Sequence, residues 1–379
     1  MAKKEIKSIA QFFRICPGSE GEQMALDVFE LIKQKKSFSP SDIEGKRGVS
    51  KKAAADYINA CVKKDLLKIS EAGKKSLLKF NDVEKKVLGI GFGDDECILI
   101  AMDLAGNITA RDFIKIDLYR KWKGKNKEVE ALVEQIRQGT KLQGERFSCA
   151  GIAFPEEMIS INPKSTEILA KGMKSLWGCD VYSTKEATAA AYGEKDSMKE
   201  PVEGTMVYLH TDIGIGAVVK GEMVFEADEY STKEGGAYLK PWNQFSVMNT
   251  AKNLIDKGVG TDIVKMANGD IDRINLDIIL RAAENKDELA EDLVKRSGLA
   301  LGVRAAYLVN LFDSNTVVLG GGTERKEGSF IQYVQESAGK FVVKNLVNRL
   351  KIVPGVLGKE ASSTGAALLC RRELFITEV

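Results

Sequence analysis

VLGIGFGDDECILIAMDLAGNI, which is residues 87–108, decides the fold of this 379-residue chain. Its apolar beginning predicts a strand, the GFGDD of residues 91–95 predicts a tight turn, and residues 97–102 predict an apolar return strand. Glycine suits such turns because it lacks a Cβ atom and adopts backbone angles that other residues avoid. The stretch therefore predicts a glycine hairpin at the start of a large domain.

A second glycine hairpin follows about 120 residues later, where residues 206–209 predict a strand and Asp212, Gly214 and Gly216 lie beyond it. Strand patterns alternate with helical patterns elsewhere in the body of the chain. Two hairpins within such an alternation predict a duplicated α/β domain with a cleft between two lobes. We expect the first lobe at 87–200, completed by a C-terminal helix at 361–379, and the second lobe at 201–360.

The overall composition, with 44% hydrophobic and 29% charged residues, is typical of a globular protein. No apolar run approaches the roughly 20 residues that a membrane-spanning helix needs. The first residues lack the apolar core and the cleavage site of a signal peptide. The six cysteines lie far apart without a CxxC pair, which favours reduced thiols. We therefore expect a cytoplasmic protein without a membrane partner.

Charge is distributed unevenly along the chain. Residues 1–87 contain 19 Lys and Arg against 12 Asp and Glu, whereas the remaining residues carry a net charge of −5. A basic N-terminal part on an acidic body indicates a polyanionic partner for that part. The alternative is an ordinary solvated basic face.

The N-terminal part has the pattern of a winged helix-turn-helix domain over residues 1–80. After a loosely ordered basic leader at 1–20, one-sided apolar spacing predicts a helix at 21–34. Ser39 and Pro40 predict the start of a second helix, and Ser50 predicts the N-cap of a third helix within 50–67. Alternating residues on both sides of a glycine turn at 67–80 predict a β-hairpin wing.

Such a domain reads DNA with the start of its third helix and with its wing. Small alanines permit close approach, and lysines can meet phosphates or guanine edges. The residues expected to contact DNA are Ser50, Lys51, Lys52, Ala53, Ala55, Lys74 and Lys75. Docking to another protein is the alternative use of a winged helix.

The order of these motifs resembles the ROK family of repressors, open reading frames and kinases, over nearly the whole chain. The resemblance implies a two-lobed, actin-like sugar-kinase fold, with phosphate hairpins at 87–107 and 212–217. The EATAAAYGE of residues 186–194 is similar to the helix that follows the family's catalytic aspartate. The NTVVLGGG of residues 315–322 is similar to its nucleotide-side strand and glycines.

The departures from the family pattern argue against phosphoryl transfer. The first hairpin's Asp-x-Gly-Gly-Thr falls on residues 91–95, so its aspartate and threonine positions hold Gly91 and Asp95. Carboxylates near a polyphosphate repel it, whereas phosphoryl transfer depends on positioning and neutralisation of charge. The degenerate phosphate hairpins comprise Gly91, Gly93, Asp94, Asp95, Asp212, Gly214 and Gly216. We therefore expect no catalytic residue and no nucleotide cofactor.

A sugar pocket could remain after the loss of activity. The resemblance places the family's catalytic Asn-Asp pair on Lys185 and Glu186, so Glu186 keeps a carboxylate at the aspartate position. A further sugar-binding segment falls on Glu234, with Ala237 in place of a histidine. The ligand residues expected are therefore Lys185, Glu186 and Glu234. A different sugar, a sugar phosphate that meets Lys185, or no ligand all remain open, as do surface salt bridges for the two glutamates.

A metal site is not expected. The family's zinc site needs a histidine and clustered cysteines, and residues 224–245 contain neither type. The single histidine of the chain, His210, lies in the second hairpin and is interpreted as structural.

The sequence therefore favours a sugar-responsive transcriptional regulator, in function a repressor. It would bind an inverted-repeat operator in double-stranded DNA as a homodimer or dimer of dimers, with a sugar or sugar phosphate as effector. The alternatives are an active sugar kinase with an appended module and a scaffold protein without ligand.

Overall fold

The computed structural model divides the chain into two compact units. The first comprises Met1–Ala189 and Ser362–Val379, and the second comprises Ala190–Ala361. The residues that the structure describes are 7–8, 37–39, 42, 50–72, 75–93, 96–116, 125–155, 158, 162–198, 204–210, 215–219, 222–226, 247–321 and 329–377. The second, discontinuous piece of the first unit means that the end of the chain returns to the unit in which it began.

A six-stranded sheet in the order β1-β8-β7-β4-β5-β6 forms the centre of the first unit. Its strands are β1 (Lys7–Ser8), β4 (Lys86–Phe92), β5 (Glu96–Asp103), β6 (Ile108–Lys115), β7 (Cys149–Phe154) and β8 (Asp180–Lys185). The strands β4, β5 and β6 are antiparallel, whereas β7, β8 and β1 continue from β4 in parallel. The predicted hairpin is confirmed, although its turn is shorter than the 91–95 expected, because Gly91 and Phe92 belong to β4 and pair with Ile98 and Cys97.

The prediction of a loosely ordered leader is wrong at residues 7–8. These two residues pair in parallel with Tyr182 and Ser183 of β8. Backbone pairing at the free edge of a sheet needs no particular side-chain pattern, so the basic composition of the leader gave no sign of it.

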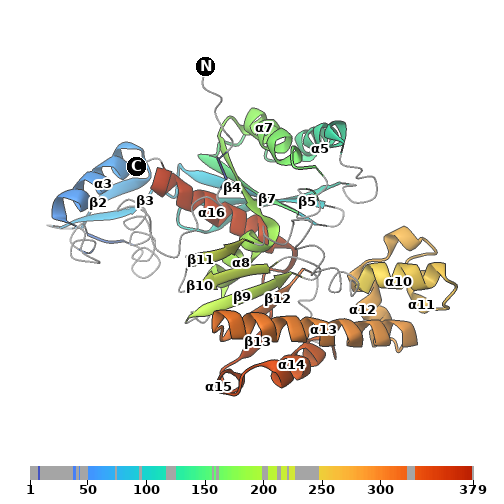
Figure 1. Cartoon of the computed structure of the whole chain (residues 1–379). Coiled ribbons are helices and arrows are strands. Elements are labelled where there is room, and N and C mark those ends of the chain that lie inside the picture. The colour runs from blue at the N-terminus through green and yellow to red at the C-terminus, as the bar shows by residue number, and fades with distance from the viewer. Residues whose placement is uncertain are drawn as a thin grey trace. The chain divides into compact units, whose positions relative to one another are not determined.

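The two faces of the first sheet are covered by different helices (Figure 1). Side chains alternate along a strand, so Leu88 and Ile90 of β4 join the apolar core shared with α5 (Asn126–Gly139) and α7 (Ser165–Trp177). Gly89 and Gly91 point to the other face, which α16 (Ala361–Thr377) covers. A Cβ atom at Gly89 would lie 1.9 Å from the carbonyl oxygen of Ser363, so only glycine admits the helix this closely.

The second unit repeats this topology in a five-stranded sheet. Its order β11-β10-β9-β12-β13 corresponds to β6-β5-β4-β7-β8 of the first sheet, with antiparallel hairpins followed by parallel strands. The strands are β9 (Thr205–His210), β10 (Ile215–Val219), β11 (Glu222–Glu226), β12 (Thr316–Gly320) and β13 (Lys351–Pro354). The predicted duplication of an α/β domain is therefore confirmed.

Helices pack against the second sheet and build the core of that unit. The helical elements are α8 (Glu186–Ser197), which begins in the first unit, α10 (Val247–Asp256), α11 (Asp262–Met266), η3 (Ile271–Arg273), α12 (Leu276–Glu284), α13 (Glu288–Phe312), α14 (Ser329–Phe341), α15 (Lys344–Val347) and η4 (Gly358–Glu360). Gly302 lets α14 approach α13, since a Cβ atom there would lie 2.5 Å from the carbonyl oxygen of Val334. Within the described ranges, no helix combines the length and apolarity that a membrane crossing requires.

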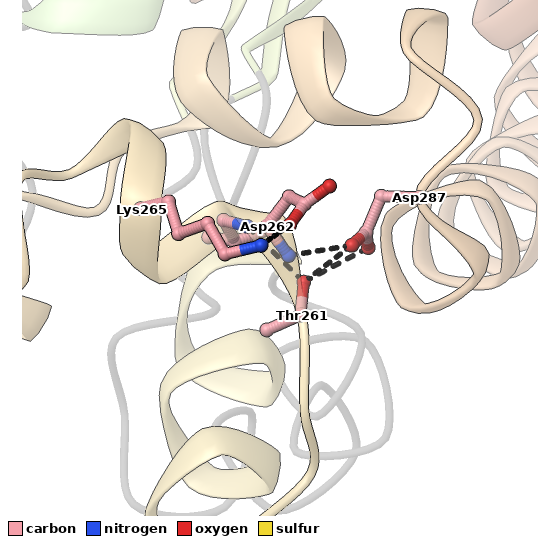
Figure 2. A network of polar contacts seen from close by, with 5 residues as sticks. Thr261, Asp262, Lys265 and Asp287 are labelled. Atoms are coloured by element: carbon pink, nitrogen blue, oxygen red, sulfur yellow. Dashed lines mark hydrogen bonds and ion pairs between the residues drawn. The ribbon is translucent and has the colours of Figure 1, made fainter.

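A polar network fastens α11 to the start of α13 (Figure 2). Asp287 is the N-cap of α13 and accepts a hydrogen bond from the Ala290 N–H at 2.9 Å. Its carboxylate also accepts from the Asp262 N–H at 2.7 Å and from the Thr261 hydroxyl at 2.9 Å. Burial acts to raise the pKa of Asp287, but these hydrogen bonds outweigh it and lower the pKa. The network is a helix cap that also joins two elements.

The N-terminal module is described from its third helix onward. It contains α3 (Lys51–Lys63) and the antiparallel hairpin of β2 (Leu67–Ala72) and β3 (Lys75–Phe80). The helix ends earlier than the 50–67 expected, because Asp65 adopts a left-handed conformation with φ of 57°. The predicted helix at 21–34 lies outside the described residues.

Candidate functional site

The junction between β8 and α8 holds two of the predicted ligand residues. Lys185 ends β8 opposite Phe154, the last residue of β7, and Glu186 begins α8. Lys185 is 6% exposed and Glu186 is half-buried. A glutamate in the first turn of a helix is favoured by the partial positive charge there. The chain thus places a cation and a carboxylate at the carboxyl ends of parallel strands, where α/β sheets bind ligands.

Three buried hydroxyl groups lie near this junction, two of them close in sequence and one on α16. Thr184, Thr188 and Thr364 are each less than 5% exposed, and their hydroxyls have no hydrogen-bond partner within the part of the chain that the structure describes. The N-terminal halves of α8 and α16 are in contact, since a Cβ atom at Gly365 would lie 1.7 Å from the Ala189 carbonyl oxygen. Buried hydroxyls usually have partners, so a hydroxylated ligand could supply them.

The first glycine hairpin packs against the start of α16. The Gly93 N–H donates to the Glu96 carbonyl at 2.8 Å and closes the turn, while Asp94 and Asp95 lie outside the described residues. A Cβ atom at Gly91 would lie 2.5 Å from the Ser362 hydroxyl and 2.9 Å from the Ser363 backbone nitrogen. Gly91 therefore accommodates the start of α16, and an aspartate at this position would require that helix to shift.

The second hairpin is described in part. Ile215 pairs with Leu209, and Gly216 lies within β10, whereas Asp212 and Gly214 lie outside the described residues. At the end of the neighbouring strand, a Cβ atom at Gly320 would lie 1.8 Å from the Tyr208 hydroxyl oxygen. The glycine at the end of the NTVVLG strand thus makes room for a buried tyrosine.

The described residues contain no group of three or more metal-binding side chains that could hold an ion. The segment with Glu234 and the family's zinc positions lies almost wholly outside them, so both expectations stay predictions. Burial raises the pKa of the Cys61 thiol to about 12 and likewise that of Cys179. Such thiols stay protonated at neutral pH and are inert as nucleophiles.

The start of α3 presents an exposed, basic surface. Ser50 caps the helix, as predicted, with its hydroxyl accepting from the Ala53 N–H at 3.1 Å. Ser50, Lys51, Lys52 and Ala55 are exposed and Ala53 is half-buried. In the wing, Lys75 begins β3 and Lys74 lies outside the described residues. The expected contact positions on α3 thus lie at one end of one helix, which is the arrangement of a groove-reading helix.

The helix α3 packs with one face buried in the N-terminal module. The apolar face predicted for the helix is buried, including Ala54, Tyr57, Ile58 and Cys61. Phe38 forms a β-bridge to Leu78 of the wing. The Ser39 N–H donates to the Asp42 carboxylate at 2.7 Å, which agrees with a helix start at Ser39.

The module also contacts α16, which sequence reasoning missed. The Tyr57 hydroxyl donates to the Phe375 carbonyl at 3.1 Å, and the Phe375 and Phe80 rings pack edge to face with centroids 5.4 Å apart. Burial raises the pKa of Tyr57 far above its usual range, so the hydroxyl remains a donor. The only sequence signal was the apolar end of the C-terminal helix, which nothing linked to residues some 300 positions earlier.

Comparison with models of known protein families shows the family to which residues 87–373 belong. The ROK family matches residues 87–373, which is about three quarters of the chain. The chain belongs to the ROK family. Among relatives of this ROK protein, a xylose repressor of Caldicellulosiruptor bescii is 22% identical over 298 residues, covering 70% of this chain and 73% of the relative. A xylose repressor of Bacillus spizizenii is 21% identical over 348 residues, covering 84% and 87%.

Solved structures agree with this fold. The crystal structure of a ROK family transcriptional regulator, a homologue of the Escherichia coli MLC protein, matches with a TM-score of 0.68 at 17% identity, covering 94% of this chain and 98% of the other. A ROK family glucokinase from Streptomyces griseus, in complex with glucose and AMPPNP, matches with a TM-score of 0.57 at 18% identity, covering 75% and 98%. The actin-like sugar-kinase fold expected for the body is therefore confirmed.

Proposed function

We propose that this ROK protein is a sugar-responsive repressor that binds operator DNA through its N-terminal module and does not phosphorylate sugars. The observation that carries the proposal is the exposed lysine-bearing start of α3 beside a β-hairpin, in a chain whose remainder is kinase-like. The matched regulator covers 94% of the chain and the matched glucokinase only 75%. The names of the xylose repressors support the same function.

The proposed domains are the winged helix at 1–80, a first lobe at 87–200 with 361–379, and a second lobe at 201–360. Two winged helices in a homodimer, or in a dimer of dimers, would read an inverted repeat with half-sites separated by whole helical turns. The DNA contacts would come from the start of α3 and from Lys74 and Lys75 of the wing.

The proposal that the protein has no kinase activity is based on the residues of the two glycine hairpins. Gly91 takes the family's aspartate position, and the packing of Ser362 and Ser363 against it leaves no room for a carboxylate. The acidic Asp94, Asp95 and Asp212 would repel a polyphosphate. Binding of a sugar is a separate property, and the effector would lie against Lys185 and Glu186, with Glu234 as a further ligand. D-Xylose is the first sugar to test because of the relatives' names.

The experiment is selection of bound duplexes from a random DNA pool by the full chain, followed by affinity measurements at several salt concentrations. Replacing Lys51 and Lys52 with alanine should weaken binding to the selected duplex. The dependence of log affinity on log salt should flatten by about 2 in slope, since each lost phosphate contact accounts for about 0.9. The matched control replaces Lys63 and Lys64, which are exposed at the other end of the same helix.

Both variants lose the same charge, so only the position differs. The control should keep most of the affinity. Equal losses in the two variants would mean a diffuse electrostatic attraction, and failure to enrich any duplex would remove DNA binding from the proposal.

A further inference from the structure

One helix joins the candidate ligand site to the DNA-binding module. The helix α16 has 17 residues, which corresponds to a length of about 25 Å at 1.5 Å per residue. Its fifth residue, Gly365, contacts Ala189 of α8, which lies three residues after Glu186. Its last turn contacts the module through Phe375. The residues that make these contacts all belong to the first compact unit, namely Ala189, Gly365, Phe375, Tyr57 and Phe80.

The first half of α16 lies in a groove of glycines. Gly89 and Gly91 of β4 and Gly151 of β7 would each place a Cβ atom within 2.5 Å of a helix atom. The helix contributes only small residues there, in the run ASSTGAA of residues 361–367. Backbone therefore lies against backbone with few interlocking side chains, a contact that allows the small sliding motions seen between packed elements.

The last turn of α16 is attached to the module by a hydrogen bond and by an aromatic contact. The final carbonyl groups of a helix have no partner within the helix, and the Tyr57 hydroxyl binds one of them, that of Phe375. The Phe375 ring is fully buried against Phe80 of the wing. The module thus holds both the backbone and a side chain of the last turn, so rotation or translation of α16 acts directly on α3 and the wing.

We propose that α16 is the element that couples the β8–α8 site to the DNA-binding module, with Phe375 as the positioning residue between them. This inference rests on the proposed function. A change at Glu186 moves the first turn of α8, the contact with Gly365 passes it to α16, and Phe375 passes it to Tyr57 and Phe80. The alternative route is the chain segment 81–85, where Asn81 is buried and donates to the Asp65 carbonyl at 3.0 Å.

The test uses the full chain and the duplex selected by it, because coupling between two sites is reciprocal. Amide hydrogen exchange is measured in peptides from 361–370, with and without duplex, and α13 of the second unit is the internal reference. In the wild type the duplex should slow exchange in 361–370 by about fivefold or more, the lower end of typical couplings. In Phe375→Leu the duplex should still bind, and the slowing should fall below about twofold.

A matched control separates coupling from loss of packing. Phe147→Leu also breaks an edge-to-face aromatic pair in the first unit, that of Phe147 and Trp177 with centroids 6.2 Å apart, and should respond like the wild type. If Phe375→Leu fails to fold, Tyr57→Phe removes only the hydroxyl that binds α16 and should show a reduced slowing.

The outcomes distinguish the two proposals. If the wild type selects no duplex, the proposed function fails and the inference fails with it. If the wild type binds duplex but exchange in 361–370 does not change, or if Phe375→Leu and Tyr57→Phe respond as the wild type does, the inference alone is wrong.

Discussion

Replacing Gly91 with alanine should destabilise the first unit, although alanine is usually tolerated better than glycine. The new Cβ atom would lie 2.5 Å from the Ser362 hydroxyl and 2.9 Å from the Ser363 nitrogen, both shorter than a van der Waals contact. Overpacking of this kind costs about 1–3 kcal/mol, whereas the reduced freedom of the unfolded chain returns about 0.4–1 kcal/mol. We expect a net loss of about 1–2 kcal/mol, measured by urea unfolding of the full chain.

The same hairpin supplies the control. A Cβ atom at Gly93 meets nothing nearer than 3.4 Å, the Glu96 Cγ atom, so Gly93→Ala should be neutral or slightly stabilising. Combining Gly91→Ala with Ser362→Gly should restore part of the loss, because the contact with the Ser363 nitrogen remains. If Gly91→Ala is as stable as the wild type, or if Gly93→Ala is the worse of the two, the packing role of Gly91 is refuted.

Two further predictions concern single carboxylates. Asp287→Ala should lower the free energy of unfolding by about 0.5–2 kcal/mol at neutral pH, the usual range for an N-cap. Because the pKa of Asp287 is lowered in the folded state, this contribution is present above the ordinary pKa and is lost as the pH falls below about 4. The urea unfolding curves of the variant and the wild type should therefore converge at low pH, and a constant gap between them would contradict the assignment. Glu186→Ala should abolish the effect of D-xylose on DNA affinity, expected at about 5–150-fold, without changing DNA binding in the absence of sugar. Glu167→Ala, on the exposed face of α7, is its control, and a normal response in Glu186→Ala would make that residue structural.

Local patterns were sufficient to predict most elements of the body. The return strand expected at 97–102 is β5, and the strand expected at 206–209 is β9, each with one further residue at either end. Both follow from hydrophobic periodicity, which acts over a few residues. The end of α3 was misplaced because Asp65 adopts a positive φ that propensity does not reveal. The edge strand β1 was not predicted, because its pairing depends on β8, which is distant in the sequence.

The candidate site was harder to predict because its contacts are remote in sequence. Gly91 was interpreted as a turn glycine of a phosphate hairpin, but its packing partner is Ser362, some 270 residues later. The resemblance to the ROK family placed Lys185 and Glu186 at the end of a strand, and the structure has them there. No local pattern could have joined Phe375 to Tyr57 and Phe80, since that contact exists only in three dimensions.

The position of α16 has a consequence for how the protein is made. This helix leaves the ribosome after every other described helix and strand, and its residues 361–370 are all buried. The second unit is one continuous segment, Ala190–Ala361, which ends where α16 begins. During synthesis the glycine face of β4 and β7 therefore stays uncovered until α16 emerges, and a chain that stops before α16 leaves that face exposed to other partners. Translation of α16 is thus a condition for covering the sheet of the first unit.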